Sequence, residues 1–255
     1  MNSRRSYRQC FQSPEEAKAY DVGQYSNLTY SSLLWDIERE LLDRILDKID
    51  GVGRQSYLDF ACGTGRVIEH LGSRFSKSVG VDISSDMLSR AEERVPGSQF
   101  YCVDIRSQPD RINDTFDVIT AFRFLLNADH VDRIAALSWL GQRLRSHTGR
   151  LLVNNHGNLW SHKAITTCLR HVTSRSGGRA LSGNVLSDRE AKRLFALSGL
   201  EVEAAYGCGV IGGKALRVIP FRKLKAIEQR AADSFLHRAG VNQLYVLRPR
   251  RSGPQ

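Results

Sequence analysis

The sequence predicts an α/β fold in which a mostly parallel sheet carries helices on both faces. Short apolar segments with the character of strands recur along the chain, and segments with helical spacing of apolar residues separate them. Neighbouring parallel strands need a crossover connection, which a helix usually supplies. The length and composition agree with such a fold. A chain of 255 residues with 41% hydrophobic and 25% charged residues is typical of a globular protein with a substantial core.

The individual elements follow from these patterns. Residues 31–49 are expected to form the first helix, because apolar residues from Leu34 to Ile49 repeat at helical spacing, and Ser31 and Ser32 can cap it. The predicted strands are 56–60, 78–81, 99–103, 116–121, 150–154, 201–205 and 243–247. The predicted helices that follow the first are 65–72, 85–94, 130–145, 159–172 and 187–198, with an extra helix over 219–237 before the last strand.

Charge and cysteine content narrow the partners and the compartment. The formal net charge is +10 with a pI near 9.6, which favours anionic partners such as nucleic acid, phosphorylated metabolites or a membrane surface. The five cysteines are scattered without a C-x-x-C pair, so neither a disulfide framework nor a metal site is expected. No apolar stretch approaches the roughly 18 residues that span a bilayer, and the N-terminus lacks a signal peptide. We therefore expect a cytoplasmic protein without a membrane span.

A glycine-rich turn follows the first predicted strand. The strand leads into the run ACGTGR (61–66), and a predicted helix comes next. Such a turn lets a ligand approach the backbone and the N-terminus of the helix. Ile68 stands where the dinucleotide fingerprint G-x-G-x-x-G has its third glycine, and no Gly-Lys-Ser/Thr follows. These departures argue against NAD and ATP, and therefore against a nicotinamide oxidoreductase.

Two acidic residues end the next two predicted strands. Asp82 ends the second strand, where its carboxylate can accept both hydroxyls of a ribose. Asp104 ends the third, where it can accept the exocyclic amine of an adenine. Asp59, at the end of the first strand, can organise the glycine-rich turn or meet an ammonium group. The ligand described by these groups has a ribose, an adenine and an amino-acid part, and it needs no phosphate.

These motifs together resemble those of the class I S-adenosylmethionine-dependent methyltransferases. The resemblance rests on LDFACGTGR (58–66), VGVDIS (79–84) and CVDI (102–105), and it covers about residues 20–155 well. It implies a Rossmann-like sheet of seven strands, the last of them antiparallel, and S-adenosyl-L-methionine as the cofactor. The departure is Ala61, which stands where the family usually has a glycine.

The resemblance also implies which residues surround the cofactor. Asp59, Gly63 and Gly65 would surround its methionine end. Asp82 would hold the ribose, and Asp104 with Ile105 the adenine. The adenine ring would pack on Ile83 and Met87, which have a plainer alternative as core residues. The complete set of expected cofactor residues is Tyr20, Asp59, Ala61, Gly63, Gly65, Asp82, Ile83, Met87, Asp104, Ile105 and Phe122.

The ends of the fourth and fifth predicted strands are where an acceptor would lie. Arg123 and Asn127 follow the fourth strand and are candidates for the site, although Arg123 can equally pair with an acid of the chain. His156 follows the fifth and is a candidate general base for a hydroxyl, with a helix-capping role as the alternative. The chain lacks the Asn/Asp-Pro-Pro-Tyr/Phe and Pro-Cys motifs of two classes of nucleic-acid methyltransferase.

The resemblance implies a division of the chain. Residues 1–30 would form a lid over the cofactor, 31–248 a single methyltransferase domain, and 249–255 a mobile tail. Within the domain, 156–186 and 207–238 would be insertions that cap the acceptor.

The expected activity is O-methylation, by in-line transfer, of a small anionic metabolite or a glycan- or lipid-linked sugar. Two basic runs motivate the anionic acceptor, because residues 133–187 and 204–227 contain no Asp or Glu. Two alternatives stay open. One is an RNA methyltransferase, which the charge favours although no RNA-binding module is evident. The other is a non-catalytic methyltransferase-like scaffold, which has no need of the intact glycine and aspartate set.

Overall fold

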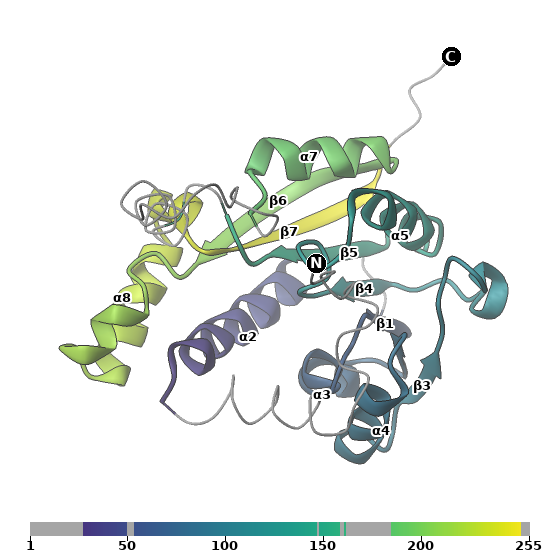
Figure 1. The fold of residues 1–255 in the computed structure, drawn as a ribbon, viewed down its shortest axis with the longest axis horizontal. Coiled ribbons are helices and arrows are strands. Elements are labelled where there is room, and N and C mark those ends of the chain that lie inside the picture. Colours follow the sequence, from purple (N-terminus) through teal and green to yellow (C-terminus); the bar gives the residue numbers. More distant parts are fainter. Residues whose placement is uncertain (1–27, 50–53, 147, 159–160, 162–184, 251–255) are drawn as a thin grey trace, which may run out of the picture.

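The computed structural model describes residues 28–49, 54–146, 148–158, 161 and 185–250. These residues form a seven-stranded sheet in the order β3-β2-β1-β4-β5-β7-β6 (Figure 1). β7 runs antiparallel to both of its neighbours, and the other pairings are parallel. The predicted fold class is therefore confirmed. The strands are β1 (Ser56–Phe60), β2 (Lys77–Asp82), β3 (Gln99–Cys102), β4 (Val118–Ala121), β5 (Arg150–Asn155), β6 (Leu200–Cys208) and β7 (Asn242–Pro249).

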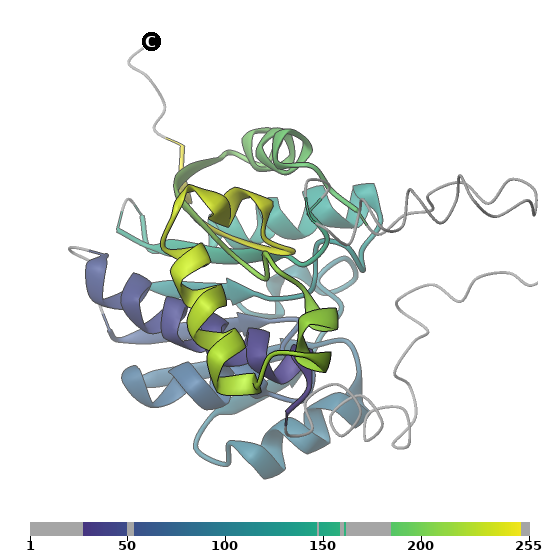
Figure 2. The same ribbon diagram turned by 90° about the vertical axis from the view of Figure 1, so that its left-hand side faces the viewer.

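Helices cover both faces of the sheet. Their bounds are α2 (Tyr30–Lys48), α3 (Arg66–Leu71), α4 (Ser85–Arg94), α5 (His130–Gln142), α7 (Asp188–Leu197) and α8 (Phe221–Ala232). Short 3₁₀ turns are η2 (Gly72–Arg74), η3 (Pro109–Arg111), η4 (Gly213–Arg217) and η5 (Phe235–Ala239). Figure 2 shows α8 crossing in front of α2. The two helices are joined by an ion pair of 2.9 Å between Lys225 Nζ and Glu40 Oε1.

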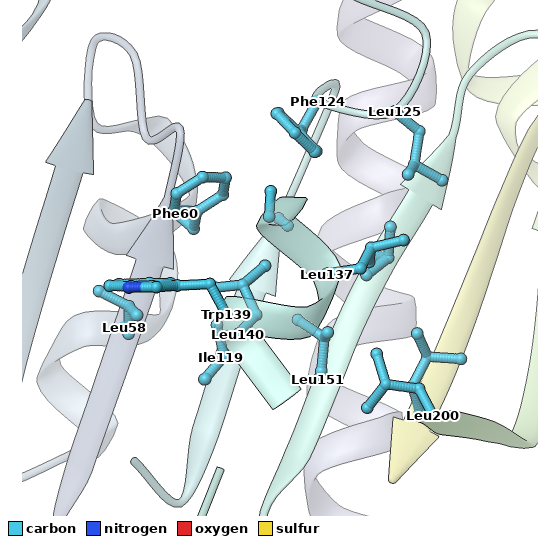
Figure 3. Close-up of a cluster of buried hydrophobic side chains, with 14 of the residues drawn as sticks. Leu58, Phe60, Ile119, Phe124, Leu125, Leu137, Trp139, Leu140, Leu151 and Leu200 are labelled. Atoms are coloured by element: carbon cyan, nitrogen blue, oxygen red, sulfur yellow. The ribbon is translucent and has the colours of Figure 1, made fainter. Parts of the chain in front are cut away.

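The core has two parts, one on each face of the sheet. On one face, Trp139 and Leu140 of α5 pack with Leu58 of β1 (Figure 3). On the other, α2 packs with Tyr57 of β1 and Val118 of β4. Tyr57 and Leu58 are consecutive yet belong to different clusters, because side chains alternate across a strand. Both faces of the sheet are thus buried, as a doubly wound fold requires.

The first helix begins one residue earlier than predicted. Thr29 is its N-cap, and the Thr29 hydroxyl accepts a hydrogen bond of 3.1 Å from the Ser32 amide. Ser31 and Ser32 are not caps, because they already lie in the first turn. The predicted apolar stripe is confirmed, since Ile37 and Ile45 are buried against the sheet.

Two other boundaries differ from prediction. The extra helix expected over 219–237 is broken after α8, and Ser234 caps a separate turn, η5. β7 reaches Pro249, and the Arg250 amide donates to the carbonyl of Gly199 at 2.9 Å, so residues 249 and 250 of the expected tail belong to the sheet edge, and the rest of it lies outside the described residues. The predicted helix 159–172 and nearly all of the predicted lid lie outside the described residues. Among the helices that are described, none has the length and hydropathy to cross a bilayer.

Candidate active site

The glycine-rich turn after β1 has a left-handed backbone. Ala61, Gly63 and Gly65 have φ values of 54°, 55° and 79°. A Cβ on Gly65 would lie 2.9 Å from the Cβ of Ala91, so glycine there lets α4 pack against the turn. A Cβ on Gly63 would meet no heavy atom within 4 Å, so space is open beside the turn. Ala61 occupies a conformation that glycine adopts more easily, which explains why glycine would suit this position.

Asp82, at the end of β2, ties the turn to the next strand. One carboxylate oxygen accepts from the Gly63 amide at 2.8 Å, and the other accepts from the Ser84 amide at 3.0 Å. Burial raises the pKa of Asp82, and these amides oppose the rise. Each carboxylate oxygen can accept more than one hydrogen bond. Asp82 is thus organised by the backbone and retains capacity for a ligand.

The residues expected at the adenine lie near the ends of β2 and β3. Ile83 is 41% exposed, whereas Met87 is buried at 5%, as its alternative role in the core requires. Asp104 accepts from the Arg106 amide at 3.0 Å. The exposed Cys102 pairs with Asp82 across β2 and β3, a neighbour that sequence reasoning missed.

The other expected cofactor residues divide between the core and the undescribed part of the chain. Ile105 packs at the edge of the cluster that contains α5. Phe122 is buried in the cluster that contains α2. Tyr20 lies outside the described residues. A contact of any of the three with the cofactor stays a prediction.

Asp59 lies beneath the turn, and its side chain is 1% exposed. Its oxygens accept from the Thr120 hydroxyl at 2.8 Å and from the Ile68 amide at 3.1 Å, which fastens β4 and the start of α3 to β1. Tyr57 extends the network, with 2.6 Å between its hydroxyl oxygen and that of Thr120. The carboxylate therefore organises the turn, one of its two expected roles. Burial raises the pKa of Asp59 to about 7.

This raised pKa predicts a pH-dependent stability. The folded chain retains the Asp59 proton up to about pH 7, whereas the unfolded chain loses it near the ordinary pKa of 3.8. The stabilising contribution is complete below that ordinary value and is lost as the pH rises through about 7. Urea unfolding at pH values from 4 to 8 tests this. Over that range the free energy of unfolding of the parent should fall by more than about 1 kcal/mol relative to that of Asp59→Asn, which cannot ionise. A difference in the free energy of unfolding between parent and variant that stays constant across this pH range would contradict the raised pKa of Asp59.

An acceptor is expected at the carboxyl ends of β4 and β5, and we call this edge of the sheet the acceptor edge. Arg123 has a left-handed φ of 56°, and its amide donates to the Asn154 side chain at 2.5 Å. Asn127 donates to the Arg123 carbonyl at 2.5 Å, so the structure brings these two candidates together. His156 follows the last residue of β5 and is half-buried. Sequence reasoning missed Glu38, although an acid on the apolar face of α2 was a signal for it.

Three basic residues of the first acid-free run, Arg143, Arg145 and Arg150, lie away from this edge. Arg145 pairs with Asp117 at 2.6 Å, just before β4 begins. Arg150 begins β5 and pairs with Glu203. Arg143 is 8% exposed and donates to backbone carbonyls. These three positions therefore do not belong to the segments that would surround an acceptor, because a parallel strand begins at the opposite edge of the sheet from its end. Arg133, at the start of α5, donates to the Ala128 carbonyl at 2.9 Å. The other basic residues of the run, Lys163, Arg170, Arg175 and Arg179, lie outside the described residues.

The architecture defines the fold class of the protein. A sheet of this order, with an antiparallel β7 and a ligand loop after β1, is that of the class I S-adenosylmethionine-dependent methyltransferases. Residues 58–147 match the family described as "Methyltransferase domain". This part of the chain is therefore similar to a methyltransferase domain, and it is set in the fold of this class.

Parts of the chain are also similar in sequence to individual methyltransferases. The chain is 41% identical over 51 residues to dTDP-3-amino-3,4,6-trideoxy-alpha-D-glucopyranose N,N-dimethyltransferase of Streptomyces venezuelae, which is 20% of this chain and 22% of that protein. It is 35% identical over 114 residues, 43% of this chain and 41% of the relative, to 18S rRNA (guanine-N(7))-methyltransferase of Schizosaccharomyces pombe (strain 972 / ATCC 24843). The matches thus span less than half the length of these relatives.

A solved structure matches over nearly the whole fold. The crystal structure of magnesium protoporphyrin IX methyltransferase from Synechocystis PCC 6803, with bound SAH, superimposes with a TM-score of 0.61. The sequence identity is 14%, and the match covers 96% of this chain and 97% of that one. At this identity, the likeness concerns the fold.

Proposed function

We propose that this protein transfers a methyl group from S-adenosylmethionine to a small-molecule acceptor. One observation carries the proposal: the open space beside Gly63 lies next to the Asp82 carboxylate and the exposed Ile83. A carboxylate beside an open glycine and an exposed apolar side chain suits a ribose joined to an adenine. These groups lie at the carboxyl ends of β1 and β2, where doubly wound sheets bind ligands.

The residues present fit this cofactor. Asp82 would accept the ribose hydroxyls, Asp104 would accept the adenine amine, and the turn at Gly63 would admit the methionine end. S-adenosylmethionine supplies an electrophilic methyl group when bound. The chain has to place the acceptor in line with that group and to exclude water.

The acceptor we propose is a nucleotide-linked sugar. The Streptomyces venezuelae relative is an N,N-dimethyltransferase of a dTDP-linked amino sugar, and its similarity to this chain supports this class of acceptor. Such a molecule is anionic through its diphosphate, which agrees with the net charge of +10. The O-methylation expected from the sequence would use a hydroxyl, for which His156 is the candidate base. The cytoplasmic location is part of the same proposal.

RNA is the second candidate acceptor. The similarity to the 18S rRNA methyltransferase and the basic pI favour it. An RNA acceptor should bind with a strong dependence on salt, because each phosphate contact releases counterions. A small sugar nucleotide, with few charges, should show a weak dependence.

Calorimetry on the purified protein tests the cofactor, and we expect saturable binding of S-adenosylmethionine. Formation of S-adenosylhomocysteine is then measured with the dTDP-linked amino sugar, its hydroxyl counterpart and bulk RNA as acceptors. Turnover of either sugar nucleotide supports the small-molecule assignment, whereas turnover of RNA alone supports the second candidate. Failure to bind the cofactor would contradict both and favour a scaffold.

A further inference from the structure

A buried carboxylate at the acceptor edge lacks part of its set of hydrogen-bond donors. Glu38, in the middle of α2, is 3% exposed. Its Oε1 accepts from the side-chain amides of Asn242 at 2.9 Å and Asn154 at 3.3 Å. Its Oε2 is buried and accepts no hydrogen bond from any residue in the described part of the chain. A buried charged oxygen without a donor is costly, so a donor from outside the described residues is expected.

The position of Glu38 connects it with the site. Asn154 lies near the carboxyl end of β5, and Asn242 begins the antiparallel β7, so both lie at the acceptor edge of the sheet. Asn154 also accepts the hydrogen bond from the Arg123 amide. Arg123 is thereby held in a left-handed conformation that residues with side chains seldom adopt. Strained residues that are fixed from several sides are concentrated at functional sites.

A second buried carboxylate nearby shows the contrast. Glu228 of α8 is 0% exposed and accepts from four donors, namely the hydroxyl of Tyr30 and the amides of residues 210, 211 and 212. These four donors account for the burial of the Glu228 carboxylate, which therefore has a structural role. The burial of Glu38 Oε2 is not accounted for in this way, because no described residue donates to it.

The described charges at this edge favour a cation. Burial, then the carboxylates of Glu38 and Glu228, raise the pKa of the Cys208 thiol at the end of β6, and Arg123 lowers it. Two carboxylates and one guanidinium therefore act on the same small region. Their sum is negative, although the protein as a whole is basic.

We propose that Glu38 forms an acceptor subsite for an amine, whose N–H group supplies the donor that Oε2 lacks. The inference rests on the proposed function and specifies its acceptor. An ammonium is held by charge as well as by a hydrogen bond, whereas a hydroxyl offers only a neutral donor. Once the ammonium has lost one proton to the solvent, the carboxylate still accepts an N–H bond, and the lone pair of the neutral amine is free for methyl transfer.

The test compares two probes in calorimetry with S-adenosylhomocysteine present. One is dTDP-3-amino-3,4,6-trideoxy-α-D-glucopyranose, and the other carries a hydroxyl in place of its amine. The parent should bind the amine more tightly than the hydroxyl probe. Glu38→Gln retains an oxygen for Asn154 and Asn242 but places an NH₂ group at Oε2. The variant should bind the amine about tenfold more weakly or worse, with little change for the hydroxyl probe.

Glu40→Gln is the matched control, because it removes the same charge from an exposed carboxylate on the same helix. It should bind both probes as the parent does. Equal affinity of the parent for the two probes would overturn the inference, whether or not Glu38→Gln folds. Equal weakening of both probes in a folded Glu38→Gln variant, or no binding of the amine by the parent, would also overturn it. If the parent does not bind S-adenosylhomocysteine at all, the proposed function is contradicted instead.

Discussion

Replacing Asp82 by alanine should weaken the binding of S-adenosylmethionine by about tenfold to a hundredfold, the range expected for hydrogen bonds to a charged group. The ribose would lose its charged acceptor. The Gly63 amide would also lose the carboxylate oxygen that now lies 2.8 Å away, so the turn would be less well held. Calorimetry of parent and variant measures the effect directly.

Two further variants separate the causes of that loss. Asp82→Asn keeps one oxygen for the Gly63 amide but removes the charge, so it should recover the stability of the turn more than the affinity. Asp114→Ala is the matched control, because this carboxylate is 59% exposed and pairs with Lys77 far from the turn. It should leave cofactor affinity unchanged. Unaltered affinity in Asp82→Ala would remove Asp82 from the cofactor site.

Replacing Glu228 by alanine should lower the free energy of unfolding by about 3 kcal/mol or more, because several buried donors lose their acceptor together. The side chain is 0% exposed, and the amides at 210, 211 and 212 donate to it over 2.7, 3.0 and 3.2 Å. Tyr30 donates to it from the start of α2. The carboxylate thus joins α8, the segment after β6 and α2.

Urea unfolding is the appropriate measurement for this effect. Asp233→Ala is the control, since that carboxylate follows α8 at 55% exposure and pairs with Arg44, where an exposed ion pair contributes less than about 1 kcal/mol. A loss in Glu228→Ala as small as in the control would mean that water or a neighbouring group replaces the carboxylate. The structural role would then be wrong.

The cofactor side of the site could be predicted from the sequence to a large extent. Gly63, Asp82 and Asp104 lie at or just after the ends of three strands that are neighbours in the sheet, β1, β2 and β3. Parallel strands with short connections bring their ends together, so residues at matching positions in the sequence meet in space. The hydrogen bond between Gly63 and Asp82 is the direct result. The direct contacts with the cofactor stay predictions.

The acceptor side could not be predicted in the same way. The hydrogen bonds of Glu38 join residues 38, 154 and 242, and no local pattern relates positions so far apart. An acid among apolar residues in a helix indicates a buried group, but its partners depend on how the helix lies on the sheet. The left-handed backbone of Arg123 likewise follows from Asn154 on the neighbouring strand.

The sequence by itself determined the fold class, the cofactor turn and the acids at the strand ends, because periodicity and local connections specify them. Only the tertiary structure decided where the charges lie. Arg145 and Arg150, which belong to the first acid-free run, lie where β4 and β5 begin, and they pair there with Asp117 and Glu203. The described acceptor edge instead holds the buried carboxylate of Glu38. The reason is geometric, since the two ends of one strand lie on opposite edges of the sheet while their residues are close in the sequence.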